Sequence, residues 1–255
     1  MTMRSRRVYE TDGLAVKLSY YGAGLAMPSH SHDFHQVSFL LGGGLSEGHG
    51  GQSRELHQQG IGVKPAGLAH DNHYHDRDGA LILSVNFRPG AGEAAAGVSP
   101  DDWHWAPHMP PARLPELHAL LSEDEAAAGD ALVDLIARLD GPPPARRTDP
   151  PAWLARVRER LDDPAETADI AAIAAEAGLH RVYLSRVFSA HYGASPSVYR
   201  LRRRVGRTLG LLAGGMRLSE AAADAGFADQ AHMTRSMKRQ TGLTPKALRG
   251  FLAAA

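Results

Sequence analysis

The sequence predicts an α+β protein of two domains, with a β-rich N-terminal part and an all-α C-terminal part. Three observations support this prediction. Short apolar segments alternate with glycine turns up to about residue 90. A proline-rich stretch lies between residues 140 and 151, and one helical unit occurs twice after residue 172. A chain of 255 residues is long enough for both domains.

The N-terminal part, from residue 8 to about residue 90, is typical of short β-strands. The segment V-S-F-L-L precedes three glycines, I-G-V-K precedes Pro65, and L-I-L-S-V-N-F precedes Arg88 and Pro89. Because these strands follow one another without helices, we expect a barrel or jelly roll.

Histidines are concentrated in this part of the chain, with eleven of fourteen before residue 120. On a strand His30, His32 and Gln36 share one face, and His70 would arrive from a partner strand. Three imidazoles and an oxygen ligand suit zinc, iron, nickel or manganese, although an amide is a poorer ligand than a carboxylate. The same four residues, with Phe39, are also candidates to line a pocket for a small effector, and no cofactor is then required.

The segments H-S-H at 30–32 and P-A-G-L-A-H at 65–70, with Gly60 upstream, resemble the two motifs of cupin barrels. This resemblance implies a cupin-like effector-binding domain over residues 1–112. Gln36 departs from the pattern, since metal-binding cupins usually have glutamate there. His73 and His75 lie among aspartates and predict an exposed turn.

Two segments between 113 and 139 have helical periodicity. The second places Leu132, Leu135, Ile136 and Leu139 on one face, which either covers the barrel or pairs with a second subunit. Five prolines and one glycine then occur between 141 and 151, so residues 140–151 are predicted to be an extended linker. Residues 152–255 are predicted to be a separate helical domain.

This helical domain contains two copies of one unit. Gly178 and Gly226 are 48 residues apart, whereas Gly193/Gly242 and Pro196/Pro245 are each 49 apart. Each copy has an alanine-rich helix ending at a glycine, a short turn, a second helix, and a Ser-Pro or Thr-Pro pair that begins the next helix. The pattern predicts a helix-turn-helix whose second helix enters the major groove of DNA.

The polar positions of each second helix are of types that read base edges, since arginine binds guanine and glutamine binds adenine. The candidates are Arg181, Val182, Ser185 and Arg186 in the first copy, and Gln230, Ala231, Thr234 and Arg235 in the second. The alternative is an ordinary solvated face of a helical bundle. Because the base-reading positions differ between the copies, the two units are expected to read different sequences.

Between the copies, an apolar stripe predicts a long helix from Ser197 to Leu212, about 24 Å in length. Such a helix can hold two recognition helices about one DNA turn apart. Gly206 and Gly210 weaken it unless they permit close packing against a neighbour. The candidates for phosphate contacts are Arg202, Arg203, Arg204, Arg207, Lys238 and Arg239.

The C-terminal region resembles the DNA-binding domain of the AraC/XylS family of transcriptional regulators. The matching residues include Ile173, Gly178, Leu184, Ser185, Arg186, Phe188, Gly193, Pro196, Gly226, Phe227, Thr234, Arg235, Gly242 and Pro245. Met233 and Met237 stand where the family commonly has aromatic residues. The resemblance implies two helix-turn-helix subdomains joined by a long helix, and dimerisation through helices near residues 113–139.

The distribution of charge supports a DNA-binding half. Residues 153–255 contain 16 Lys and Arg against 9 Asp and Glu, whereas residues 1–152 contain 12 against 19, so the two halves carry +7 and −7. There is no cysteine, which excludes disulfides and thiolate zinc sites and fits a reducing cytoplasm. No signal peptide or membrane span is visible, so we expect a cytoplasmic protein.

These observations favour a non-enzymatic, sequence-specific transcriptional regulator that responds to a small effector in the barrel. Its expected partners are double-stranded DNA, the effector, RNA polymerase and a second copy of the chain, with no membrane. One alternative is a metal-dependent cupin enzyme with an accessory helical domain. Another is a DNA-binding protein with a vestigial barrel.

Overall fold

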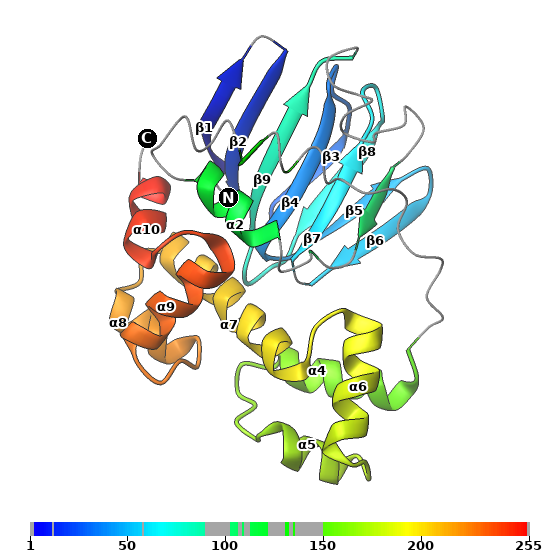
Figure 1. The fold of residues 1–255 in the computed structure, drawn as a ribbon, viewed down its shortest axis with the longest axis vertical. Coiled ribbons are helices and arrows are strands. Elements are labelled where there is room, and N and C mark those ends of the chain that lie inside the picture. Colours follow the sequence, from blue (N-terminus) through cyan, green and yellow to red (C-terminus); the bar gives the residue numbers. More distant parts are fainter. Residues whose placement is uncertain are drawn as a thin grey trace.

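The computed structural model describes residues 3–11, 13–57, 59–89, 103–106, 109, 113–121, 131–132, 135 and 150–253. In this part of the chain two antiparallel sheets are followed by helices (Figure 1). The six-stranded sheet has the order β1-β2-β9-β4-β7-β10, and the four-stranded sheet has the order β3-β8-β5-β6. This arrangement confirms the predicted α+β class, with a β-rich N-terminal part and an all-α C-terminal part.

The strands are short and connected by glycine turns, as predicted. Their bounds are β1 Met3–Thr11, β2 Leu14–Tyr21, β3 Ala26–His30, β4 His35–Gly43, β5 Leu45–His49, β6 Gln52–Leu56, β7 Gly60–Lys64, β8 His70–Tyr74, β9 Ala80–Phe87 and β10 His104–Ala106. The helices among the described residues are α2 Leu114–Leu120, α4 Ala152–Asp162, α5 Ile170–Glu176, α6 Arg181–Tyr192, α7 Pro196–Ala213, α8 Leu218–Asp224, α9 Gln230–Thr241 and α10 Pro245–Ala253.

The six-stranded sheet has two chemically different faces, because side chains alternate along a strand. On β4, Val37, Phe39 and Leu41 are buried in a large apolar core, whereas Gln36 and Ser38 line a cavity. The same alternation holds on β2 and β9, where Leu18 and Leu83 belong to that core and Ser19 and Ser84 line the cavity.

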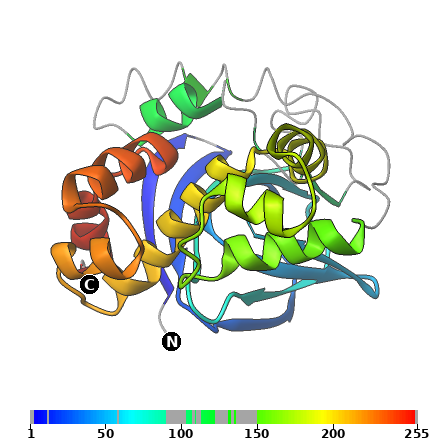
Figure 2. The same cartoon turned by 90° about the horizontal axis from the view of Figure 1, so that it is seen from below.

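The apolar face of this sheet packs against the C-terminal helices. Val205 and Leu209 of α7 and Met237 of α9 belong to the same core as the strand residues. Figures 1 and 2 show α7 crossing below the lower ends of the strands, with α8, α9 and α10 on the β1 side and α4, α5 and α6 on the other side. The α4–α6 region has its own core, which includes Leu184 and Phe188.

The two repeated units have the predicted turn geometry. Gly178 and Gly226 both adopt positive φ, at 68° and 80°. The next residue of each unit donates its backbone N–H to the carbonyl five positions back, Leu179 to Ala174 and Phe227 to Ala222, both at 2.9 Å. These bonds close each helix in a Schellman-type cap that requires a left-handed residue, which explains the glycine in both copies.

The helix N-termini are also capped as expected. The Ser195 hydroxyl accepts from the Val198 N–H at 3.4 Å, and the Thr244 hydroxyl accepts from the Ala247 N–H at 3.2 Å. Proline follows each cap at the first helical position. No helix among the described residues is both long and apolar enough to cross a lipid bilayer.

Candidate DNA-binding surface and barrel cavity

The first candidate recognition helix, α6, presents its predicted base-reading positions to solvent. Arg181, Val182 and Arg186 are exposed and Ser185 is half-buried, while Leu184 and Phe188 on the opposite face are fully buried. Val182 is 62 % exposed, which is unusual for a side chain of its size and apolarity. An exposed apolar side chain on a recognition helix is suited to contact a thymine methyl group.

Tyr183 was not among the predicted contacts, yet it is 45 % exposed beside them. The Arg186 guanidinium lies 5.8 Å from the centre of the Tyr183 ring. A cation over an aromatic face is attracted to it, which limits the directions in which the guanidinium points. The signal that sequence reasoning missed is this one-turn spacing of Tyr183 and Arg186.

The second candidate recognition helix, α9, has the same design. Gln230, Ala231 and Arg235 are exposed, and Thr234 is half-buried with its hydroxyl donating to the Gln230 carbonyl at 2.8 Å. The eight base-reading positions predicted from the sequence therefore lie on the outer faces of α6 and α9.

The two methionines that depart from the family pattern are both fully buried in α9. Met233 and Met237 belong to the core that α9 shares with the sheet. A flexible thioether side chain can fill the space that an aromatic ring fills elsewhere. The departures therefore preserve the buried face of the helix.

Two of the predicted phosphate contacts are placed differently from expectation. Arg202 is only 8 % exposed, and its burial lowers its pKa to about 10. Arg203 forms ion pairs with Asp78 at 3.2 Å and with Asp162 at 2.9 Å. The prediction that Arg202 and Arg203 contact phosphates is therefore wrong. Both side chains lie within the protein, because α7 is flanked by the sheet on one side and by α4 on another.

The other predicted phosphate contacts remain accessible to varying degrees. Arg204 and Arg207 of α7 are half-buried, whereas Lys238 and Arg239 of α9 are exposed. Lys238 Nζ donates to the Gly242 carbonyl at 2.8 Å, which places this cation at the C-terminal end of the helix, where a positive charge is favourable.

The glycines of α7 allow the helix to approach the sheet closely. A Cβ on Gly210 would lie 2.2 Å from the Arg77 carbonyl oxygen, and a Cβ on Gly206 would lie 3.1 Å from the Gly43 backbone nitrogen. Side chains at these two positions would push the backbones apart. The glycines therefore permit the close packing against a neighbour that we considered from the sequence. Gln59 adds a polar contact across the same junction, because its side-chain amide donates to the Gln240 carbonyl.

The polar face of the six-stranded sheet and the four-stranded sheet enclose a cavity of about 740 Å³, including its open mouth. Its lining includes Lys17, Ser19, His30, His32, Gln36, Ser38, Lys64, His70, Asn72, Ser84 and Asn86. Phe39, which we predicted to face this pocket, instead belongs to the opposite core and is fully buried. Gln36 and Phe39 are three residues apart on one strand, so they must face opposite sides.

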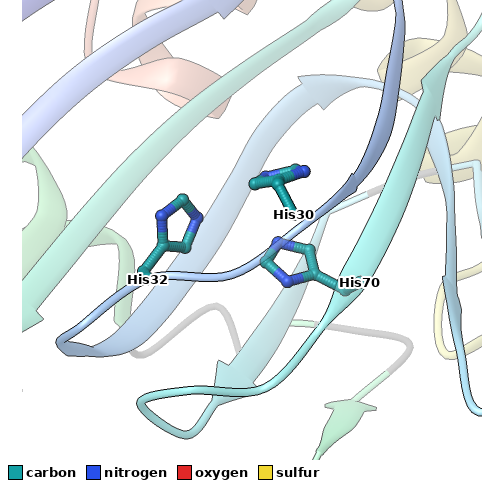
Figure 3. A group of neighbouring side chains, drawn as sticks. All are labelled: His30, His32 and His70. Carbon is teal, nitrogen blue, oxygen red and sulfur yellow. The ribbon is translucent and has the colours of Figure 1, made fainter.

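The three predicted histidines do come together in this cavity (Figure 3). One ring nitrogen of each of His30, His32 and His70 lies within 4.8 Å of the others. The Nδ1 atoms of His30 and His70 lie 2.8 and 3.1 Å from the carbonyls of Pro28 and Leu68. A ring that donates Nδ1–H to a carbonyl keeps its Nε2 lone pair for a ligand.

Burial favours the neutral form of two of these imidazoles, His32 and His70. Burial, followed by the neighbouring His70 and His30, lowers the pKa of His32 to about 4. Burial and then Lys64 also lower the pKa of His70. Neutral imidazoles are the form that coordinates a divalent metal, so these residues are chemically able to hold one.

Gln36, the predicted fourth ligand, is engaged within the sheet. Its amide nitrogen donates to Asn86 Oδ1 at 2.8 Å, and its amide oxygen accepts from the Ser38 hydroxyl at 3.1 Å. These bonds hold the amide along the polar face of the sheet. The cluster therefore consists of three imidazoles with a neutral polar neighbour rather than a carboxylate.

A buried ion pair that the sequence did not reveal lies beside the cavity. Glu47 is fully buried, and one of its oxygens accepts from Lys64 at 2.8 Å and Asn72 at 2.9 Å. The other oxygen accepts from the indole N–H groups of Trp103 and Trp105 at 2.7 and 2.8 Å. Burial alone would raise the pKa of Glu47, but Lys64 and these donors outweigh it and lower the pKa to about 2.

The predicted exposed turn at His73 and His75 is wrong in two respects, because His73 belongs to strand β8 and His75 is half-buried. His73 is exposed and its Nε2 lies 3.5 Å from Asp76. His75 is half-buried, with its ring facing Glu55 and His57. No local pattern marks this difference, because Glu55 and His57 come from a different part of the chain.

Part of the helical segment between the two halves is described. Leu132 and Leu135 are buried in the chain's own core, which corresponds to the covering role considered for this face. Ile136, Leu139 and most of the proline-rich linker lie outside the described residues.

Comparison with known proteins supports the assignment of the C-terminal helices. Residues 173–250 match a protein family described as a helix-turn-helix domain. No curated protein matches the chain. The resemblance of this region to AraC-type regulators is confirmed.

Several solved structures are similar in fold. ToxT from Vibrio cholerae O395 is 11 % identical, with 96 % of this chain and 100 % of that chain covered and a TM-score of 0.40. The C-terminal domain of AraT, a response regulator from Geobacillus stearothermophilus, is 20 % identical, with coverages of 40 % and 88 % and a TM-score of 0.38. A cupin superfamily protein from Desulfitobacterium hafniense is 14 % identical, with coverages of 34 % and 78 % and a TM-score of 0.32. At such low scores these similarities do not establish a shared function.

The two repeated units with their exposed faces, and the family match over them, define the class of this protein. Residues 173–250 form a helix-turn-helix domain of the AraC type. The chain is a DNA-binding transcriptional regulator.

Proposed function

We propose that this regulator reads one asymmetric DNA site with α6 and α9 in successive major grooves, and that a small molecule in the barrel cavity controls binding. The observation that carries the proposal is the pair of exposed recognition faces at the two ends of α7. Helix α7 has 18 residues, so it is about 27 Å long. This length, with the turns that follow, is suited to one DNA turn of about 34 Å.

The two units share one arginine and differ elsewhere. Arg186 and Arg235 occupy equivalent positions, each suited to a guanine. Gln230 in the second unit replaces Arg181 in the first, which changes the preferred base from guanine to adenine. We therefore expect each half of the site to have its own sequence. The exposed Lys238 and Arg239 are proposed to contact phosphates.

The proposed effector is a small polar molecule that carries a carboxylate. The cavity lining combines neutral hydrogen-bonding groups with Lys17, and the charge of Lys64 is already balanced by Glu47. The strands that line the cavity also hold the DNA-binding helices on their other face. A ligand that moves β4 by a fraction of an ångström would therefore also shift the core that β4 shares with the DNA-binding helices. It would favour one arrangement of the barrel and the DNA-binding helices over another.

We propose that the effector-binding unit comprises residues 1–112, with residues 113–139 as its helical cover, 140–151 as the linker and 152–255 as the DNA-binding unit. Pairing with a second copy of the chain is proposed to use another face of this segment, because Leu132 and Leu135 are buried in the chain's own core. In a dimer each copy would present α6 and α9, so the operator would contain two such half-sites.

Selection of bound sequences from random DNA tests the DNA-binding proposal. The expected result is an asymmetric half-site in which Arg235→Ala relaxes one position and Arg181→Ala relaxes a different one. The spacing of repeated half-sites reports the oligomeric state. A symmetric half-site, or a selected sequence that neither variant changes, would contradict the proposal.

A thermal-shift screen of small carboxylic acids and matched neutral sugars tests the effector. Carboxylates are expected to raise the Tm of the wild type and not of Lys17→Gln. Stabilisation by neutral sugars alone would show that the ligand class is wrong.

A second candidate function, a metal-dependent cupin enzyme, is favoured by the cluster of His30, His32 and His70. Metal analysis of the purified chain distinguishes it from an effector pocket. Stoichiometric metal that disappears in His30→Gln/His32→Gln, together with turnover of a substrate, would support the enzyme. Metal without turnover would leave the cluster as a ligand-binding element of the regulator.

A further inference from the structure

A second group of potential metal ligands lies at the junction between the barrel and the DNA-binding helices. Glu55 belongs to β6, His57 follows this strand, and His75 follows β8. One ligand atom of each residue lies within 4.8 Å of the others. This group shares no residue with the three histidines in the barrel cavity.

The distances within this group match a coordination shell better than an ordinary hydrogen bond. The Nε2 atoms of His75 and His57 lie 3.5 and 3.8 Å from the same Glu55 oxygen, whereas N–H···O bonds are usually about 2.7–3.2 Å. Ligands about 2.0–2.2 Å from a zinc ion at tetrahedral angles are about 3.3–3.6 Å apart. Two of the three ligand separations are therefore close to the tetrahedral value, and the third, between the two imidazoles, is at most 4.8 Å.

The three side chains are of types that bind zinc. Two imidazole nitrogens and one carboxylate oxygen lie in one cluster, and imidazoles and carboxylates are the ligands of many zinc sites.

The local backbone leaves room for this arrangement. A Cβ on Gly44 would lie only 2.2 Å from Nδ1 of His75, so a side chain there would displace the ring. The rings of His57 and His75 are half-buried with centres 5.0 Å apart, and the Glu55 carboxylate is exposed. One side of the group is thus open to solvent, where a water molecule can complete four-fold coordination.

We propose that Glu55, His57 and His75 form a site for a divalent transition metal of the zinc type. The site adjoins the contact between the two halves of the chain, because the His57 carbonyl accepts from Arg203 at 3.4 Å and Arg203 also pairs with Asp78. A bound dication places positive charge beside Arg203, which opposes the approach of α7 to this end of the barrel. Metal binding and the packing of α7 are therefore coupled.

The test measures zinc bound per full-length chain by competition with a chromophoric chelator, in a His30→Gln/His32→Gln background that disables the barrel histidines. The background protein is expected to bind one zinc ion. Adding His57→Gln and His75→Gln is expected to abolish binding, and adding Glu55→Gln is expected to weaken it by about ten- to a hundredfold. Circular dichroism checks that each variant is folded.

His73→Gln provides a matched control, since His73 has the same 3.5 Å spacing to a carboxylate but belongs to no three-residue group within the described chain. This control is expected to leave zinc binding unchanged. Should the quadruple variant fail to fold, His75→Gln alone in the same background is expected to weaken zinc binding at least tenfold. A background protein that binds no zinc, or one that keeps its zinc after loss of His75, would overturn the proposal.

Discussion

Replacement of Gly210 by alanine tests whether α7 packs on the barrel in solution. The added methyl group would lie 2.2 Å from the Arg77 carbonyl oxygen and 3.3 Å from the Asp78 Cα. Even weak C–H···O contacts keep carbon and oxygen about 3.3–3.6 Å apart. Helix α7 must therefore retreat by about 1 Å, or the loop at Arg77 must move.

The magnitude follows from two opposing effects. Replacing glycine with alanine within a helix stabilises it by about 1 kcal/mol, whereas overpacking a close contact costs about 1–3 kcal/mol. Gly250 in α10 provides the matched control, because a Cβ there meets nothing within 4 Å. The two variants should therefore differ in unfolding free energy by about the overpacking cost, 1–3 kcal/mol.

Thermal unfolding of the two full-length variants is the assay. For a chain of this size 1 kcal/mol corresponds to about 2–4 °C in Tm. Gly250→Ala is expected to raise the Tm by about that amount, and Gly210→Ala is expected to leave it unchanged or lower it. If both variants gain the same stability, α7 does not contact Arg77 in solution, and the reasoning about the junction fails.

Three further predictions concern the DNA surface, the buried ion pair and the cavity. In fluorescence anisotropy, Arg235→Ala is expected to weaken binding to the selected site by about 1–3 kcal/mol, with little change for random DNA. Arg239→Ala should weaken binding to both DNAs and reduce the slope of log affinity against log salt by about 1. Equal losses of affinity for the two DNAs in Arg235→Ala would identify Arg235 as a phosphate contact. The Glu47 carboxylate stabilises the fold above its usual pKa of 4.5, and this contribution is lost as the pH falls toward its folded pKa of about 2. Glu47→Gln should lower the unfolding free energy by about 3–5 kcal/mol at pH 7, because Lys64 loses its buried partner. The unfolding free energy of this variant, measured with urea, should also depend less on pH between 4.5 and 2 than that of the wild type. The same pH dependence in both proteins would show that Glu47 is not responsible for the loss of stability in acid. Ser84→Leu should fill the cavity and abolish the effector-induced thermal shift while DNA binding without effector persists; a retained shift would place the effector elsewhere.

The repeated units were predictable because their determinants are local. A glycine with positive φ, a hydroxyl cap and a proline at the first helical position occur in order along the chain, as at Gly193, Ser195 and Pro196. Each of these residues is required by backbone geometry alone. The outward faces of α6 and α9 followed from helical periodicity for the same reason.

The residues whose positions were predicted wrongly fall into two groups. Some depend on contacts with distant parts of the chain, and one was assigned to the wrong face of its strand. Phe39 was predictable, since strand parity alone separates it from Gln36. Arg203 was not, because its partner Asp78 is on a loop of the other half of the chain. The pair of Glu47 and Lys64 likewise joins two different strands, and no spacing in the sequence marks it.

The alternation along β4 gives this regulator a short path between ligand and DNA. Gln36 and Ser38 line the cavity, while Val37 and Phe39 belong to the core that also contains Leu209 of α7. Interiors packed at crystal-like density transmit small displacements instead of absorbing them. The effector proposed above, held by the polar face, would therefore alter the packing of α7, which lies between the two recognition helices. Coupling between the barrel and the DNA surface thus needs no mobile element beyond this one strand and this one helix.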